Sequence, residues 1–326
     1  MINQFRKLNP VNLLLLVLVA FVLRIGFFYS LPEKIEISME EPISKLISNE
    51  ALQLFFTPLS NVLSAMILTI AQAILFNKIV NEHNLLGKPS FLPALMFVTV
   101  SSILPPFLII SAPLLCNFMS LWIISKFLKL YRNEDALSVM FDEGMIVAAG
   151  TMIYFPFIAM LLLLWVSLVI FRPFNWREWI AALLGFITVY FFVAVYYYWH
   201  DMLGSFYYIW KPLTQPVLTN IPFKLNDYLP LIPLAVICLI SSFALRQVFF
   251  KSFVQVRKAY QVFFFMFLLA LVSVILKTRF DVIHFLLCVS SVAILIAYYF
   301  LQARKRWIYE SLYLILVGFI IYFQVF

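Results

Sequence analysis

Long apolar stretches separated by short charged clusters recur from one end of this 326-residue chain to the other. A straight helix needs about 20 mostly apolar residues to cross a bilayer. Eleven runs equal or approach that length, namely residues 11–29, 58–75, 90–104, 107–127, 140–153, 155–171, 179–198, 228–245, 262–276, 282–301 and 308–326. The pattern predicts an all-α fold, a polytopic transmembrane helical bundle.

Two breaks make the number of helices ten or eleven. Pro105-Pro106 and Tyr154-Phe155-Pro156 each separate two apolar runs by only a few residues. Proline interrupts a helix because it lacks the backbone N–H and its ring clashes with the preceding turn. Either pair of runs is therefore compatible with two short spans or with one broken re-entrant hairpin.

Composition supports the membrane assignment. The chain is 64% hydrophobic and only 12% charged, with a mean hydropathy of +1.01. Soluble domains are usually about 45–50% apolar and about 25% charged, so a soluble fold of this composition would lack polar surface. No long polar segment interrupts the runs, and the sequence predicts a single integral membrane domain over residues 1–326. A cytoplasmic ATPase or kinase domain is excluded, because the loops on that side are short.

The basic residues indicate how the bundle is oriented. With the N-terminus in the cytoplasm, sixteen Lys and Arg residues fall in inner segments and six in outer segments. Arg24, inside the first helix, completes the total of 23. This asymmetry follows the positive-inside rule and accounts for the net charge of +8 without nucleic acid as a partner. We expect a multi-pass protein of a bacterial inner membrane.

The first outer loop carries the candidate catalytic groups. It runs from residue 31 to about 57, and Glu36, Glu40 and Glu41 lie in its first half. A carboxylate at the membrane surface can serve as a general base towards an acceptor hydroxyl; the alternative is an ordinary solvated loop. The second half, residues 43–56, has the spacing of an amphipathic helix lying on the membrane.

Candidate substrate-binding groups lie in two later outer segments. A short turn contains Lys277 and Arg279, with His284 about one helical turn further. Interfacial cations bind phosphate well, so a polyprenyl-phosphate headgroup is a natural ligand; the alternative is a turn anchored by snorkelling cations. His200 and Asp201 follow an aromatic cluster, which the aromatic belt of membrane proteins also explains.

Ionisable groups within the apolar runs are scarce. Arg24 is a further candidate for substrate binding, or else an interfacial anchor or structural partner. The acids of Phe141–Gly144 fit the first turn of a helix, where the helix dipole favours negative charge. No carboxylate is then expected at membrane depth, and only seven residues are glycine. Both features argue against a transporter.

Metal and disulfide chemistry find no support in the sequence. The three cysteines lie inside apolar runs without partners at metal-ligand spacing, and the three histidines are scattered. We therefore expect no metal site, and the sequence indicates no particular cofactor.

Five strings resemble those of an uncharacterised family of multi-pass inner-membrane proteins from Bacteroidota. They are Asn9–Asn12, Ser111–Asn117, Phe141–Gly144, Tyr154–Pro156 and Arg172–Trp179. The resemblance extends over most of the chain. It implies an envelope location and carries no assigned activity.

A second resemblance is architectural, to the GT-C type of glycosyltransferases that use polyprenyl-phosphate sugars. Such enzymes have an acidic first outer loop, an interfacial helix after it and a late outer basic residue that holds lipid phosphate. Glu33–Glu41, residues 43–56 and Arg279 occupy matching places. The chain departs from that pattern in lacking an Asp-containing motif in the first loop and a large C-terminal outer domain.

Three hypotheses follow for the function. The first is an envelope-glycan enzyme, such as a GT-C-like glycosyltransferase, acting on a polyprenyl-phosphate-linked substrate at the outer face. The second is a non-catalytic subunit or scaffold of an envelope complex, with a membrane-protein partner. The third is a transporter or flippase.

Overall fold

The computed structural model describes residues 1–29, 31, 57–130, 135–210, 213, 229–250, 252–277 and 280–325. These residues form helices and contain no strand, which confirms the all-α fold class. The α-helices are α1 (Ile2–Phe5), α2 (Val11–Val22), α3 (Ile25–Tyr29), α6 (Pro58–Glu82), α7 (Leu92–Val100), α8 (Ala112–Leu130), α9 (Ala136–Ile153), α10 (Met160–Phe171), α11 (Trp176–Trp199), α12 (Leu203–Tyr208), α13 (Leu231–Phe249), α14 (Val254–Val272), α15 (Val289–Gln302) and α16 (Arg306–Val325). Short 3₁₀ turns are η1 (Pro105–Leu108), η2 (Phe155–Ala159), η5 (Ser273–Leu276) and η6 (Val282–Cys288).

The described part contains seven helices long and apolar enough to cross a membrane. Three shorter apolar helices, at Val11–Val22, Phe155–Phe171 and Leu231–Gln247, accompany them. The chain is a multi-pass membrane protein whose exposed apolar helix faces contact lipid. The interfacial helix predicted for residues 43–56 lies outside the described residues.

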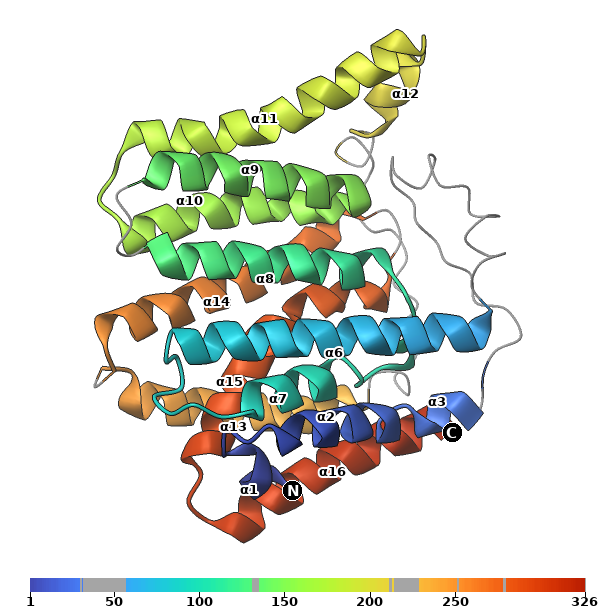
Figure 1. Cartoon of the computed structure of the whole chain (residues 1–326), viewed down its shortest axis with the longest axis vertical. Coiled ribbons are helices and arrows are strands. Elements are labelled where there is room, and N and C mark those ends of the chain that lie inside the picture. Colours follow the sequence, from blue (N-terminus) through green and yellow to red (C-terminus); the bar gives the residue numbers. More distant parts are fainter. Residues whose placement is uncertain are drawn as a thin grey trace.

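Most of the long helices lie side by side in one bundle, with their ends at two opposite sides (Figure 1). The C-terminal ends of α6, α8, α10 and α15 lie at the left side in this view. The start of α6, together with α3 and α12, lies at the right side. Helix ends predicted to be cytoplasmic thus share one side and those predicted to be outer share the other; we use "inner end" and "outer end" in this sense.

The two proline-containing breaks have different outcomes. The segment before Pro105 forms only α7, whose nine residues, Leu92–Val100, are all buried. At 1.5 Å per residue α7 is about 14 Å long, about half of a hydrocarbon core. The predicted run 90–104 is therefore a buried half-helix and not a full span. At Tyr154 the chain passes instead through η2 directly into α10.

The tightest helix pair is α9 with α11, and two glycines allow the close approach. A Cβ atom added at Gly144 would lie within 2.0 Å of the carbonyl oxygen of Ala182. One added at Gly185 would lie equally close to the carbonyl oxygen of Phe141. Small residues at such crossings let helix backbones touch, which favours helix association within a membrane.

The N-terminal segment joins the bundle to its C-terminal helices. The Arg6 guanidinium donates to the carbonyl oxygens of Phe300 and Ala303 at the end of α15, at 2.6–2.9 Å. It also lies 4.1 Å from the centre of the Tyr309 ring. The N-terminal ammonium pairs with Glu310 at 2.9 Å. These contacts hold the N-terminal segment against the last two helices of the bundle.

Candidate functional site

The most developed polar group at the outer end is centred on His284 in η6. Its side chain is fully buried. Nε2 lies 2.7 Å from the carbonyl oxygen of Ala270 and 3.1 Å from the Ser273 hydroxyl. A carbonyl oxygen only accepts, so Nε2 carries a hydrogen. In the neutral ring Nδ1 is then the acceptor, and the Tyr154 hydroxyl donates to it at 2.6 Å.

Lys277 and Asp281 lie beside this group. The Lys277 ammonium is 5.2 Å from the centre of the Tyr154 ring, within range of a cation–π interaction. It is also 3.6 Å from the Asp281 carboxylate. The Lys277 side chain is only 14% exposed, whereas that of Asp281 is 37% exposed. The cation is thus held against the bundle, which differs from a side chain extended towards water.

Local sequence explains why these side chains meet. Asp281 caps η6, because its carboxylate accepts from the backbone N–H of Ile283 at 3.0 Å. On α8, the buried Asn117 amide donates to the carbonyl oxygen of Leu286, which fixes η6 against the bundle. Tyr154 takes an extended conformation at the end of α9, so its ring turns out of the helix towards His284. We call Tyr154, Ser273, Lys277, Asp281 and His284 the outer-turn cluster.

Arg24 is fully buried between α2 and α3 and belongs to a different group. Its guanidinium donates to the Ala20 carbonyl oxygen, to the Ser102 hydroxyl and to the Thr69 hydroxyl, at 3.2–3.3 Å. Gln324 of α16 donates to the carbonyl oxygens of Leu23 and Ser102 nearby. Within the described chain Arg24 forms no ion pair, and its Nε has no hydrogen-bond partner. This group is a polar junction of four segments.

The remaining predicted residues do not join either group. His200 and Asp201 lie at the exposed end of α11, where the His200 ring lies on the Tyr196 ring, with centroids 4.3 Å apart. His200 Nδ1 is bonded to the Tyr196 carbonyl oxygen. The candidates Glu36, Glu40, Glu41 and Arg279 lie outside the described residues. Of the six predicted substrate-binding residues, the structure therefore brings together Lys277 and His284.

Glu143 is a potentially functional residue that the sequence-based prediction misplaced. The Phe141–Gly144 string was expected to begin a helix, but α9 begins at Ala136. Glu143 lies seven residues into the helix, about 10 Å from its start. Its side chain is fully buried, and neither carboxyl oxygen has a hydrogen-bond partner among the described residues. The prediction that Phe141–Gly144 forms the first turn of a helix is wrong, and Glu143 lies within a helix long and apolar enough to cross a membrane.

The reason for the error lies in the residues that precede the apolar run. Ala136–Val139 form helix although the strongly apolar run starts only at Met140. Asp142, the neighbour of Glu143, points elsewhere and pairs with Lys126 of α8 at 3.5 Å. Hydropathy averages over both acids, whereas helix geometry separates them by about 100° around the axis.

Metal binding and similarity to known proteins add no further constraint. The described residues contain no group of three or more His, Cys, Asp or Glu side chains that could hold a metal ion. No family model, curated protein or solved structure matches this chain. The site is therefore interpreted from its own geometry.

Proposed function

We propose that this membrane protein is an envelope-glycan enzyme that uses a polyprenyl-phosphate-linked substrate at the outer ends of its helices, in the manner of GT-C-type glycosyltransferases. One observation supports the proposal most directly, namely the way in which Lys277 is held. A cation that merely anchors a turn extends towards the headgroups. Lys277 is instead largely buried over Tyr154, whose hydroxyl is held by His284.

The cluster suits a lipid phosphate for a physical reason. An ammonium in a partly buried setting interacts with a phosphate more strongly than one in water, because the effective dielectric constant is lower. Lys277 and Arg279 would supply the cations, with the phosphate taking the place of the Asp281 carboxylate beside Lys277. Tyr154 and His284 would position Lys277. The first-loop acids Glu36, Glu40 and Glu41 would act as general base towards the acceptor hydroxyl. The orientation with this face outside the cytoplasm is part of the proposal.

Lipid binding provides the first test. The purified chain is incubated with undecaprenyl phosphate or with undecaprenol, and bound lipid is counted by native mass spectrometry. We expect a preference for the phosphate that Lys277→Ala weakens and Lys277→Arg retains. Lys88→Ala, at the inner end, is the matched control. Equal binding of the phosphate and the alcohol would contradict the proposal.

Catalysis is tested separately in cells whose own copy of the gene is deleted. Alanine variants of Glu36, Glu40, Glu41 and Arg279 are supplied on a plasmid, and envelope glycans are analysed alongside protein levels. We expect loss of a glycan product in at least one variant whose protein level is normal. Unchanged glycans in all four variants would exclude the enzyme and favour the scaffold hypothesis.

Glu143 supports a second candidate function, a proton-coupled carrier. Ionisable groups within membrane helices often belong to proton relays. Because neither Glu143 carboxyl oxygen has a hydrogen-bond partner among the described residues, we expect this group to exchange protons when a path to it opens. Proton flux into proteoliposomes under a pH gradient is the measurement, with Glu143→Gln against Asp142→Asn. Equal flux in both variants and the unchanged protein would remove this candidate.

A further inference from the structure

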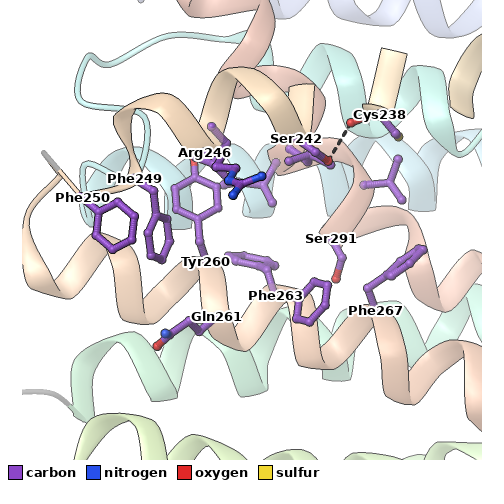
Figure 2. Close-up of a pocket in the computed structure, with 15 residues that line it drawn as sticks. Cys238, Ser242, Arg246, Phe249, Phe250, Tyr260, Gln261, Phe263, Phe267 and Ser291 are labelled. Atoms are coloured by element: carbon purple, nitrogen blue, oxygen red, sulfur yellow. Dashed lines mark hydrogen bonds between the residues drawn. The ribbon is translucent and has the colours of Figure 1, made fainter. Parts of the chain in front are cut away.

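A groove between α13 and α14 has no role in the proposed chemistry. The two helices follow one another in the chain, and both pack against α15. Between them they leave a space of about 620 Å³ (Figure 2). The space lies in the half of the helix pair towards its inner end, where the C-terminal turn of α13 contains Arg246.

Hydrocarbon and aromatic surface dominates the walls of the groove. Phe249 of α13, Phe263 and Phe267 of α14 and Leu295 of α15 all line it. Two of the polar groups in the lining are occupied, whereas the buried Ser291 hydroxyl oxygen has no hydrogen-bond partner among the described residues. The Ser242 hydroxyl donates to the Cys238 carbonyl oxygen, and the Tyr260 hydroxyl donates to the Leu85 carbonyl oxygen. Such walls suit an acyl chain, which offers no hydrogen bonds.

Arg246 gives the groove a charge. Its side chain is exposed, and it forms no hydrogen bond or ion pair with any other described residue. The negative end of the α13 dipole favours a cation at this position, but the dipole does not account for the open apolar space beside it. Figure 2 shows the Arg246 side chain together with Phe249 and Tyr260 at one end of the groove. An anion with an apolar tail complements this arrangement.

The chemistry of the groove favours a lipid over a protein helix as its occupant. Its walls are apolar along their length, and Arg246 is the charged side chain among the residues that line it. An anionic headgroup at Arg246 with an acyl chain along the apolar walls matches both features.

We propose that the groove binds an anionic phospholipid of the inner-end leaflet, with one acyl chain between α13 and α14 and the phosphate at Arg246. Basic pockets between membrane helices on the cytoplasmic side are known to hold anionic headgroups. The inference is independent of the proposed enzyme, because it concerns the opposite end of the bundle.

The test compares two lipids that differ only in headgroup. The full-length chain in detergent is titrated with phosphatidylglycerol or phosphatidylcholine of identical acyl chains, and binding is followed by native mass spectrometry. We expect about fivefold tighter binding of phosphatidylglycerol, the amount typical of one basic residue near a membrane surface. Arg246→Gln should abolish this preference, and Arg304→Gln, an exposed cation at the same end, should preserve it.

A second variant probes the chain-binding part of the groove. Ser242 lines the groove and is exposed, so Ser242→Phe fills the space without disturbing the buried core. We expect weaker binding of both lipids with an unchanged melting temperature. Unaltered binding in Ser242→Phe, or an unaltered headgroup preference in Arg246→Gln, would overturn the proposal. A change of oligomeric state in either variant would also overturn it and would identify a second copy as the occupant.

Discussion

At the scale of single residues, the fully buried side chains of His284, Arg24 and Glu143 differ in their degree of hydrogen bonding. Both ring nitrogens of His284 are bonded. Arg24 is bonded through its terminal nitrogens only, and Glu143 has no bonded carboxyl oxygen among the described residues. A buried polar group without a partner costs about 1–3 kcal/mol. The free-energy cost of unpaired polar atoms is therefore lowest for His284 and highest for Glu143.

The first prediction concerns the hydroxyl of Tyr154. Tyr154→Phe removes the donor to His284 and leaves the buried Nδ1 unpaired, so we expect a loss of about 1–3 kcal/mol in stability. The melting temperature in detergent is the measurement. Tyr198→Phe, at a 67% exposed side chain, is the control and should change nothing. Equal melting temperatures for the two variants would show that the bond to His284 contributes nothing.

At the scale of helices, one pair in the bundle is closely packed and another pair leaves a groove. The α9–α11 pair is in backbone contact at Gly144 and Gly185. The consecutive pair α13 and α14 is separated by a groove. Since lipid tails are as apolar as leucine, helices in a membrane associate through fit more than through exclusion of water. The α9–α11 pair is therefore closely packed, whereas the α13–α14 pair leaves a groove between its helices.

The second prediction tests the close packing of α9 against α11. Gly144→Ala places a methyl group against the Ala182 carbonyl and forces α9 and α11 apart, so we expect destabilisation of about 3 kcal/mol or more. Gly318→Ala is a matched control, because a Cβ atom there meets nothing within 4 Å. In a helix interior that change should be neutral or stabilising by up to about 1 kcal/mol. Resistance to proteolysis and the melting temperature would report both effects, and similar behaviour of the two variants would refute the close-packing argument.

At the scale of the whole molecule, the helix ends lie at two opposite sides of the bundle (Figure 1). The distribution of positive charge predicts which of these sides is cytoplasmic. The predicted orientation in the membrane can be tested from two loops. Lys88 follows α6 at the inner end, and Asp201 follows α11 at the outer end.

The third prediction uses single cysteines in these two loops. The native Cys116 and Cys288 are buried, and Cys238 lies within the apolar α13. The native cysteines should therefore give little background labelling by maleimide in intact cells. A membrane-impermeant maleimide should label Asp201→Cys in intact cells and Lys88→Cys only after the cells are opened. The reverse pattern would invert the topology and place the outer-turn cluster in the cytoplasm.

The parts of the structure that the sequence could predict are those that depend on local composition. The lengths of the apolar runs predicted the positions of most of the long helices in the sequence. This works because membrane insertion depends on the summed hydropathy of the side chains along one segment. The Tyr154–His284 hydrogen bond joins residues 130 positions apart, and no local pattern contains that information. The position of Glu143 within α9 was missed for a related reason, because it depends on where α9 starts. Lys277 and His284 could be considered together because they lie only seven positions apart in the sequence.

The buried half-helix α7 has a consequence for the biogenesis of the protein. With nine residues it is too short to span the bilayer by itself, and it packs mainly against α6 and α15. Because α15 begins at Val289, the ribosome must synthesise nearly 200 further residues before that packing surface exists. Until α15 is synthesised, α7 can pack only against α6, in the translocon or at the lipid interface. Chains truncated before α15 should therefore be recognised by membrane quality-control proteases, whereas chains that include α15 should escape them.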